Sequence, residues 1–368
     1  MRVGVNGAFL GARYTGIRTY TCGLLTKLVP QLEEVLVYAS SADPFGSAAI
    51  QWRKTSDLLQ ADRGTRGNLA RFCWMQTVLR HRLWQDGVEV LVSPLAEGIL
   101  HAGIPQVLVV HDLIPLFYSK ECPRLGVYMK AVLPFILRQN TLVVTDSFHT
   151  KQDLHRNYSI QDSQVVVVYP GLDSVYTSTQ SGDPPSGLPA GPYFLFVGTC
   201  APRKNLATVL RAYAQIQHRI SESLCVVVPE SRLTLDLESL ACELGISERV
   251  RILSRLPPPQ LVYLYRNATA LVLLSEYEGF GYPILEAMAL GTPAIVSNST
   301  SLAEIAGSAA IQLNPTDVSA ASSAMLELAA NPERRKQMGD LGARHAREFT
   351  WQRAALSFRN AIHGCLPS

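Results

Sequence analysis

The 368-residue sequence lacks the patterns that several classes of protein require. Its seven cysteines are scattered and never spaced as Cys-x-x-Cys, which argues against a disulfide framework or a zinc ribbon and favours a reducing compartment. No apolar run approaches the roughly 20 residues that cross a bilayer, and no charged-then-apolar leader precedes the first apolar segment. The net charge is only +3, which argues against a general nucleic-acid binder. We therefore expect a cytoplasmic protein with no nucleic-acid partner.

Signatures of cofactors and metal ions are missing as well. The eight histidines are isolated, and no Asp-x-Asp pair is present to hold a cation against a diphosphate. The glycine-containing segment 5–20 does not have the Gly-x-Gly-x-x-Gly spacing of a dinucleotide-binding fold, and no acidic ribose partner is evident. These absences argue against an oxidoreductase and predict that the protein requires no cofactor and no metal ion.

What the sequence does contain is material for two buried sheets. Apolar residues make up 47% of the chain and charged residues 17%, and short β-branched runs alternate with helix-compatible segments. Such near-continuous apolar strands, separated by helices, are typical of parallel sheets, so the sequence predicts an α/β fold with two Rossmann-like domains. The expected strands are 2–5, 35–38, 88–92, 106–110, 142–145 and 165–169 in the first half, and 193–197, 224–229, 250–253, 270–274 and 294–296 in the second.

A stretch rich in Thr, Ser, Gly and Pro at 176–192 separates the two halves. We therefore expect an N-terminal domain at 1–175, a linker at 176–192, a C-terminal domain at 193–348, and a C-terminal helix at 349–368 that packs back on the N-terminal domain. Ligands of open α/β sheets bind at the carboxyl ends of the strands. The predicted site is a cleft where these ends face each other.

The segment 275–293 contains the most informative motif, Ser-Glu-Tyr-Glu-Gly-Phe-Gly-Tyr-Pro-Ile-Leu-Glu-Ala-Met-Ala-Leu-Gly-Thr-Pro. An apolar strand leads into a loop with two glycines, and Pro283 is placed to open a short helix. Glycines let the backbone approach a ligand, and the amides at a helix start favour a phosphate. Glu278 and Glu286 flank these amides and can accept hydrogen bonds from sugar and ribose hydroxyls. By itself the glutamate pair also fits a cap and a solvated helix residue.

This motif resembles the signature of the family 4 retaining glycosyltransferases of the GT-B fold (glycosyl transferases group 1), whose two glutamates are separated by seven residues, as Glu278 and Glu286 are. In that family the first glutamate contacts the donor sugar, the second contacts the ribose, and the amides between them touch the sugar and diphosphate. The resemblance thus implies further donor contacts at Gly279, Phe280, Gly281, Tyr282, Pro283 and Ile284.

A second motif, Gly-Thr-Cys-Ala-Pro-Arg-Lys-Asn at 198–205, follows another apolar strand. Arg203 and Lys204 either pair with diphosphate oxygens there or are solvated. The resemblance favours the first interpretation, because related enzymes place a lysine before asparagine here to neutralise the departing nucleotide. Many relatives also have an arginine directly after the glycine, where this chain has Thr199 after Gly198, so Arg203 is the expected substitute. We assign all four residues to the donor site, and Arg203, Lys204 and Glu278 to catalysis.

In the motif Val-Val-His-Asp-Leu-Ile-Pro at 109–115, His111 ends an apolar strand. It is either a buried core residue or a ligand contact. The motif resembles one in which family 4 enzymes use the histidine to hold the donor sugar near its reactive centre, which makes His111 a catalytic candidate. Asp112 is an acceptor contact or a helix cap.

The remaining candidates also rest on the resemblance. Gly16 matches a glycine that lets an early loop approach the donor phosphate or the acceptor, and Tyr14 in the same loop is an acceptor candidate. Base recognition around Ile252 is expected to use backbone atoms. Thr145-Asp146-Ser147 resembles a strand end and helix cap of the family, with Ser147 as the cap.

The segment 51–84 holds seven Arg and Lys residues against two Asp. Basic residues beside tryptophans suit peripheral contact with an anionic membrane, on its inner face, or with an anionic acceptor. A solvated helix with a core-facing stripe explains the pattern too. The residues expected near that one helical face are Leu69, Phe72, Cys73, Leu79 and Leu83, with Arg71, Trp74 and Arg82 elsewhere.

The resemblance implies a retaining, metal-independent glycosyltransferase. It would move a hexosyl unit from a UDP-glucose-type or GDP-mannose-type donor, which is a substrate and not a cofactor, to a saccharide or lipid-linked saccharide acceptor in polysaccharide or glycoconjugate assembly. Two alternatives stay open from the residues alone: a sugar-nucleotide-binding protein without turnover, and a sugar-nucleotide epimerase or hydrolase.

Overall fold

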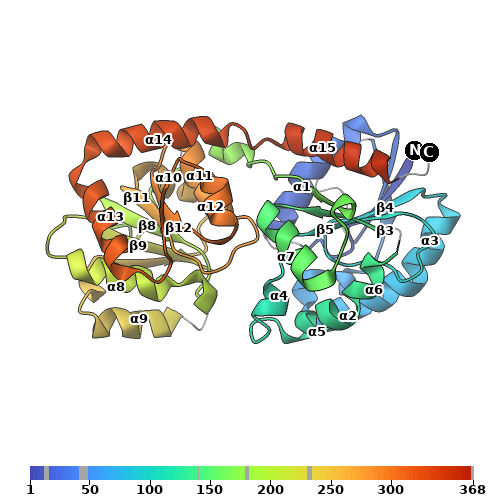
Figure 1. Ribbon diagram of the computed structural model, residues 1–368, viewed down its shortest axis with the longest axis horizontal. Helices are drawn as coiled ribbons and strands as arrows, with labels where there is room; N and C mark the ends of the chain where they lie inside the picture. Colours follow the sequence, from blue (N-terminus) through green and yellow to red (C-terminus); the bar gives the residue numbers. More distant parts are fainter. Residues whose placement is uncertain (12–15, 41–48, 140, 179–181, 230–233, 366–368) are drawn as a thin grey trace. The chain divides into compact units, whose positions relative to one another are not determined.

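The computed structural model describes residues 1–11, 16–40, 49–139, 141–178, 182–229 and 234–365. The chain divides into two compact units: unit 1 comprises Met1–Gly171 and Phe349–Ser368, and unit 2 comprises Leu172–Glu348. Each unit contains one parallel sheet with helices packed against it (Figure 1). The predicted α/β class with two Rossmann-like sheets is confirmed.

Unit 1 has a seven-stranded sheet in the order β3-β2-β1-β4-β5-β6-β7, with every neighbouring pair parallel. Its strands are β1 (Arg2–Asn6), β2 (Glu34–Ala39), β3 (Ile50–Lys54), β4 (Val90–Ser93), β5 (Gln106–Val110), β6 (Thr141–Thr145) and β7 (Val165–Val167). Its helices are α1 (Gly16–Leu28), α2 (Gly64–Trp74), α3 (Arg80–Gln85), α4 (Ile114–Phe117), α5 (Pro123–Ala131), α6 (Leu133–Leu137), α7 (Phe148–Tyr158) and α15 (Trp351–Gly364).

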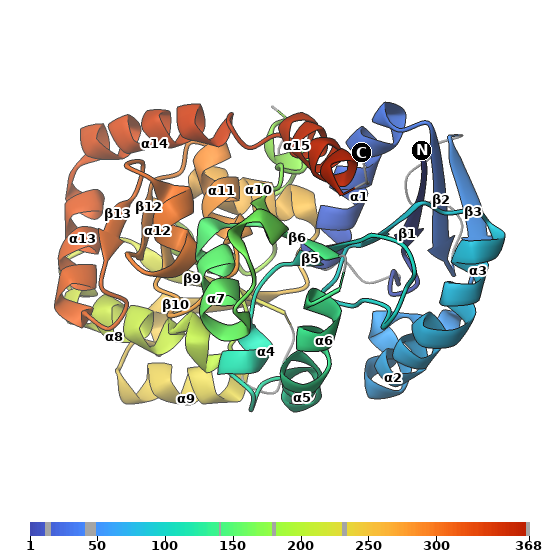
Figure 2. The same ribbon diagram turned by 45° about the vertical axis from the view of Figure 1, so that its right-hand side comes forward.

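The inner strands of unit 1 are apolar on both faces because helices cover both faces (Figure 2), whereas the edge strand β3 is partly exposed. In β2, Val35 and Val37 belong to the core cluster that includes α1 and α15, whereas Leu36 and Tyr38 belong to the cluster that includes α3. Successive side chains of a strand point to opposite faces, so a strand covered twice is apolar at nearly every position. This explains the uninterrupted apolar runs of the sequence.

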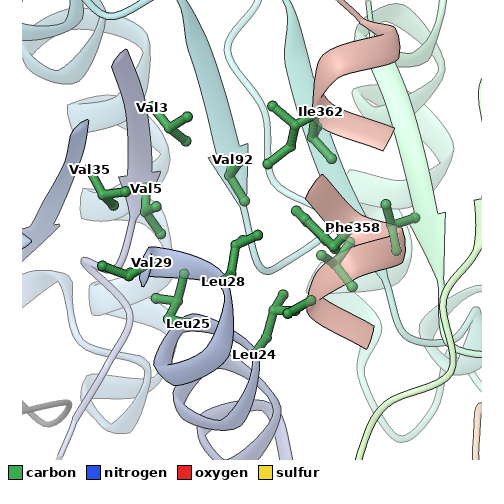
Figure 3. Close-up of a cluster of buried hydrophobic side chains, with 14 of the residues drawn as sticks. Val3, Val5, Leu24, Leu25, Leu28, Val29, Val35, Val92, Phe358 and Ile362 are labelled. Atoms are coloured by element: carbon green, nitrogen blue, oxygen red, sulfur yellow. The ribbon is translucent and has the colours of Figure 1, made fainter. Parts of the chain in front are cut away.

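Helix α15 is part of the unit 1 core although it comes from the end of the chain. Figure 3 shows Phe358 and Ile362 of α15 facing Leu24 and Leu28 of α1, and all four side chains are almost completely buried. A Cβ atom at Gly23 of α1 would lie 2.2 Å from Cε2 of Trp351, so α1 approaches α15 more closely than any other residue there would allow. The two helices therefore form one packed layer on the sheet.

The helical run at 64–85 contains a π-helical turn at Met75–Leu79 between α2 and α3. Its buried apolar positions recur every four residues at Met75, Leu79 and Leu83. The predicted core-facing stripe is correct at Leu79 and Leu83 but wrong at Leu69, which is 63% exposed, and at Cys73, which is exposed. The wide turn shifts the phase of the helix, and a regular helical periodicity does not anticipate that shift.

Only some of the basic side chains in this helical run lie on the surface. Trp84 is 78% exposed, but Arg71 is 3% exposed and holds the carboxylate of Glu97 with two hydrogen bonds, of 2.7 Å from Nε and 2.6 Å from Nη2. A paired guanidinium at such a site is a structural ion pair. Arg71 therefore adds no charge to a basic surface.

Unit 2 has a six-stranded parallel sheet in the order β10-β9-β8-β11-β12-β13. Its strands are β8 (Tyr193–Val197), β9 (Ser223–Val228), β10 (Val250–Ser254), β11 (Ala270–Leu273), β12 (Ala294–Ser297) and β13 (Ile311–Leu313). Its helices are α8 (Leu206–Ile216), α9 (Thr234–Glu243), α10 (Pro258–Asn267), α11 (Tyr282–Ala289), α12 (Thr300–Ala306), α13 (Val318–Ala330) and α14 (Pro332–Ala346). Figure 1 shows α8 and α9 on one face of this sheet and α10 and α11 on the other.

The strand order of unit 2 reverses between β8 and β11, which lie side by side in the sheet. Crossovers leave toward opposite faces at such a point, and the two loops that follow the strands diverge and leave room for a ligand. The loop after β8 carries the motif at 198–205, and the loop after β11 carries the motif at 275–293. The topology thus brings the two informative motifs of unit 2 to the same edge of the sheet.

We predict that Phe358→Ala destabilises the chain by about 3–5 kcal/mol, because it removes a fully buried aromatic ring between α1 and α15. Leu356→Ala on the same helix is the matched control: Leu356 is 46% exposed, and its loss should change the free energy of unfolding by no more than about 0.5 kcal/mol. Urea titration followed by tryptophan fluorescence measures both. Equal unfolding midpoints for the two variants would contradict a structural role of α15 in the core.

Candidate active site

The carboxylate of Glu278 is the centre of the candidate site in unit 2. Glu278 is 6% exposed, and its Oε1 accepts hydrogen bonds from the ammonium group of Lys204 and, at 2.8 Å, from the hydroxyl group of Ser275. Its Oε2 lies 3.7 Å from Nη1 of Arg203. The structure thus brings together the three catalytic candidates of this unit. Two basic side chains and one carboxylate thus lie together after the carboxyl end of β8.

The basic pair is positioned by a short turn and by one asparagine. Pro202–Lys204 form a 3-10 helix, and Asn205 follows it in the left-handed conformation with φ of 52°. The side-chain amide of Asn205 donates a hydrogen bond of 3.1 Å to the carbonyl of Leu274, at the end of β11. The backbone amide of Glu276 donates one of 2.7 Å to the carbonyl of Arg203. These contacts join the loops after β8 and β11, and the sequence patterns gave no signal for them.

The glycine loop between β11 and α11 is held in one conformation. Gly281 has φ of 101°, which favours glycine, and a Cβ atom there would lie 2.5 Å from Cδ2 of Leu302. The hydroxyl of Ser301 donates a hydrogen bond of 2.9 Å to the backbone carbonyl of Glu278. The loop continues directly into the first turn of α11. The predicted donor contacts that lie along this loop and turn are Gly279, Phe280, Gly281, Tyr282, Pro283 and Ile284.

Glu286 lies in α11 and is not a solvated helix residue. Its Oε2 accepts a hydrogen bond of 2.7 Å from the hydroxyl of Tyr265, and the hydroxyl of Tyr176 also hydrogen-bonds the carboxyl group. Burial, the largest influence, raises the pKa of Glu286 to about 7; the two tyrosine hydrogen bonds lower it, and the charge of Asp173 raises it. Glu286 therefore changes its charge near neutral pH. Neither tyrosine is predicted as a site residue from the sequence.

The other donor candidates of unit 2 lie at different distances from Glu278. A Cβ atom at Gly198 would lie 3.8 Å from Cδ of Lys204, so Gly198 borders the basic pair, and Thr199 is exposed in the same loop. Ile252 lies in the edge strand β10, and β9 separates that strand from β8. This separation is about 10 Å at the usual strand spacing. Ile252 is thus outside the Lys204–Glu278 cluster.

In unit 1, His111 lies directly after β5. Its Nδ1 is 2.6 Å from Oδ2 of Asp146, and its Nε2 is 3.0 Å from the backbone carbonyl oxygen of Pro94. The ring of Tyr20 packs edge-on against the imidazole, with 4.7 Å between the ring centroids. His111 is mostly buried, with 17% of its side chain exposed. The sequence did not indicate the contact with Asp146.

A cavity of about 390 Å³ lies within unit 1 beside His111. Its polar lining includes Asp112 and the buried ion pair of Arg71 and Glu97, and its apolar lining includes Leu95 and Met129. Oδ1 of Asp112 also accepts a hydrogen bond of 2.9 Å from the amide of Ile114. Leu113 and not Asp112 is the N-cap residue of α4, and Asp112 binds the first amide of that helix while it lines the cavity.

The early loop is only partly described. Tyr14 lies outside the described residues. Gly16 begins α1 and is exposed, and a Cβ atom there would meet no other atom within 4 Å, so packing does not require a glycine at this position. Its neighbours Ile17 and Arg18 line the cavity of unit 1. Ser147 is the N-cap of α7, and its side chain accepts a hydrogen bond of 3.1 Å from the amide of Thr150.

Two kinds of feature are absent from the described ranges. Among these residues no group of three or more His, Cys, Asp and Glu side chains is placed to hold a metal ion. Within the same ranges no helix is both long enough and apolar enough to cross a membrane.

Comparison with known proteins adds independent evidence. Residues 14–176 match the model "Glycosyltransferase Family 4", and residues 185–345 match "Glycosyl transferases group 1". The O-antigen chain mannosyltransferase B of Escherichia coli is 30% identical over 265 residues, which are 68% of this chain and 68% of that protein. The O-antigen chain mannosyltransferase RfbU of Salmonella typhimurium is 27% identical over 249 residues, which cover 67% and 68% of the two chains.

A solved structure extends the similarity in fold to the whole chain. The sucrose-phosphate synthase of Thermosynechococcus elongatus superposes with a TM-score of 0.77 at 18% identity, over 99% of this chain and 98% of that one. The two matched models divide the chain into the same halves as the two parallel sheets do. This chain belongs to the family 4 glycosyltransferases of the GT-B fold, the glycosyl transferases group 1.

Proposed function

We propose that the chain is a retaining, metal-independent glycosyltransferase that moves a hexosyl unit from a nucleoside-diphosphate hexose to a saccharide or lipid-linked saccharide. A mannosyl unit from GDP-mannose is the first choice, because both relatives described above are named mannosyltransferases of the O-antigen chain; UDP-glucose is the second. Their names also support assembly of a polysaccharide or glycoconjugate. The observation that carries the proposal is the buried contact of Lys204 and Arg203 with Glu278 at the strand-order reversal of unit 2.

This cluster suits the donor because its cations have an exchangeable partner. A diphosphate offers charged oxygens that compete with the carboxylate of Glu278 for Lys204 and Arg203. Once Lys204 and Arg203 bind the diphosphate, the oxygens of Glu278 can accept hydrogen bonds from the hydroxyl groups of the hexose. The hydroxyl of Ser275, 2.8 Å from Oε1, keeps the carboxylate oriented. Donor binding thus replaces one set of charge-assisted hydrogen bonds with another.

The proposed reaction needs no covalent enzyme intermediate. The acceptor hydroxyl oxygen bonds to the anomeric carbon on the face from which the phosphate leaves, and the bond between that carbon and the phosphate oxygen breaks. The hydroxyl proton passes to the departing phosphate, which leaves a glycoside of retained configuration and a nucleoside diphosphate. Lys204, Arg203 and the backbone amides at 279–284 stabilise the charge of the leaving group, where preorganised donors have their largest effect. His111 is proposed to contact the transferred hexose.

The acceptor is proposed to bind in the cavity of unit 1. This cavity combines apolar side chains with Asp112 and the Arg71–Glu97 pair, a lining that suits a saccharide attached to an apolar group. A lipid-linked acceptor would bring the chain to a membrane surface, and segment 51–84 exposes Leu69 and Trp84 beside its basic residues. Gly16 and the exposed loop at Thr199 complete the proposed donor and acceptor contacts.

A panel of GDP- and UDP-hexoses, with and without saccharide acceptors, tests this function. We expect a glycoside and free nucleoside diphosphate only when donor and acceptor are both present, with unchanged rates in excess EDTA and with the donor's anomeric configuration in the product by NMR. Product without any acceptor would identify an epimerase or hydrolase. Donor binding without turnover against any acceptor would favour the sugar-nucleotide-binding alternative.

We predict that Lys204→Ala and Glu278→Gln each lower kcat/KM by more than about tenfold, a loss of transition-state stabilisation above roughly 1.4 kcal/mol. Both changes disrupt the cluster that is proposed to release the nucleotide. Lys336→Ala and Glu333→Gln, at exposed positions of α14, are the matched controls and should retain full activity. Steady-state rates are compared after circular dichroism has shown that all four variants are folded. Near-normal rates for the first two would remove Lys204 and Glu278 from the mechanism.

We also predict that donor affinity depends on pH through Glu286. Because its pKa is about 7, the carboxyl group gains a proton as the pH falls through neutrality, and a protonated carboxyl group accepts fewer hydrogen bonds from ribose hydroxyls. The Kd of the intact sugar nucleotide, measured by calorimetry between about pH 5.5 and 8.5, should therefore rise toward acid pH. Glu286→Gln should abolish this dependence.

Tyr265→Phe provides the matched variant for this titration. The Tyr265 hydroxyl lowers the pKa of Glu286, so its removal should move the midpoint of the Kd profile to higher pH. An unchanged midpoint in Tyr265→Phe, or the same acid dependence in Glu286→Gln, would assign the ionisation to another group.

A further inference from the structure

His111 and Asp146 are brought together by the register of two neighbouring strands. In the parallel pairing of β5 and β6, Val110 is opposite Thr145, so the residues that follow the two strands lie side by side. The side chain of Asp146 is 4% exposed and directs Oδ2 at Nδ1 of His111. The third group of the arrangement, the carbonyl oxygen of Pro94, follows β4, the neighbour of β5 on its other side. Three adjacent strands therefore position this histidine.

Both ring nitrogens of His111 face oxygen atoms that accept hydrogen bonds. A backbone carbonyl oxygen has no proton to donate, so Nε2 must carry the proton of its 3.0 Å contact with Pro94. A carboxylate likewise accepts, so Nδ1 must carry the proton of its 2.6 Å contact with Asp146. A neutral imidazole has one proton for two such contacts and would leave a lone pair against an oxygen. The geometry fits the imidazolium form.

Among the described side chains, His111 is the one that the structure pairs with the carboxylate of Asp146. Its Oδ1 is buried with no hydrogen-bond partner in the described part of the chain, and the same holds for the hydroxyl of Tyr20, whose ring packs on the imidazole. A buried carboxylate with so few hydrogen bonds is unfavourable unless a cation lies beside it. The charged form of His111 supplies that cation.

Other groups around His111 also influence its pKa, and several charged residues line the cavity beside it. Burial is the largest single influence and lowers the pKa of His111, but the charge and hydrogen bond of Asp146, the carbonyl of Pro94 and the charge of Asp112 outweigh it, so the net pKa is raised above the ordinary value. The charged residues that share the cavity lining with His111 are Arg18, Asp62, Arg71, Glu97 and Asp112.

We propose that Asp146 is a positioning residue that keeps His111 doubly protonated and fixed in orientation at the cavity of unit 1. His111 then acts as a cation toward a bound substrate and not as a proton acceptor, because both nitrogens already carry protons that are engaged by Asp146 and Pro94. This inference rests on the proposed function for the contribution of His111 to transfer. The protonation of His111 is independent of that function.

Histidine titration by NMR tests the proposal directly. In the wild-type chain the His111 resonance, identified by its loss in His111→Gln, should remain that of imidazolium above the ordinary histidine pKa of about 6.5. In Asp146→Asn the neutral amide can still accept a hydrogen bond but carries no charge, so the proton affinity of His111 should fall by more than about tenfold. A wild-type His111 that is neutral at or below about pH 6.5 would overturn the proposal without any variant.

Asp153→Asn is the matched control. Asp153 is another buried aspartate that faces a histidine, with Oδ2 3.3 Å from Nε2 of His149, and it does not line the cavity. The Asp153→Asn variant should leave the His111 resonance unchanged. If Asp153→Asn shifted His111 as much as Asp146→Asn does, the effect would be a general loss of buried charge and the proposal would fail.

Turnover provides a second readout. The loss of rate that follows His111 deprotonation should lie at higher pH in the wild type than in Asp146→Asn, so the variant should approach the wild-type rate at acid pH and fall about tenfold or more below it at alkaline pH. A parallel loss at all pH values would mean that Asp146 only supports the fold, and would overturn the positioning role. If the wild type transfers no hexose at all, the proposed function fails, and the NMR titration still decides the protonation of His111.

Discussion

The buried contact of Glu278 with Lys204 and Arg203 is the interaction on which the candidate site of unit 2 depends. Each of the three groups would be costly to bury alone, because a charge without a partner loses its hydration and gains nothing in return. Together they hold the loops after β8 and β11 against each other. In the proposed function the contact is also the one that the diphosphate replaces, so the group that organises the site competes directly with the ligand. A site of this kind is ordered before the donor arrives and still able to bind it.

Both units build their sites in the same way, from residues that directly follow parallel strands. In unit 1, Pro94, His111 and Asp146 follow the adjacent strands β4, β5 and β6; in unit 2 the two informative loops follow β8 and β11. The carboxyl ends of parallel strands lie at one edge of a sheet, so side chains far apart in the sequence converge there with no structure of their own. Strand register then sets the fine geometry, as the pairing of Val110 with Thr145 does for His111 and Asp146.

The sequence predicts contiguous features well and long-range contacts poorly. Buried strands such as β8 and β11 are uninterrupted apolar runs. The edge strand β3 (Ile50–Lys54) is partly exposed and contains polar residues, and the short strand β13 (Ile-Gln-Leu) is partly exposed and interrupted by a polar residue, so neither gives such a signal. The glycine motif was recognisable because its residues are consecutive. The sequence does not assign three hydrogen bonds of the site, because only the fold brings their partners together. These hydrogen bonds join Ser275 to Glu278, Asn205 to Leu274, and Tyr265 to Glu286. The π-helical turn at Met75–Leu79 is not predicted either, because the sequence pattern is interpreted as one regular α-helix.

The carboxyl groups of Glu278, Asp146 and Glu286 have different neighbours, and their proposed roles differ accordingly. Glu278 and Asp146 face basic side chains: Glu278 contacts Lys204 and Arg203, and Asp146 contacts His111. Glu286 faces tyrosine hydroxyls, which donate hydrogen bonds but carry no charge, and burial therefore brings its pKa to about 7. The charge of the group proposed to hold the ribose therefore changes near neutral pH. In the proposed function, small changes of pH near neutrality should therefore change donor binding through Glu286.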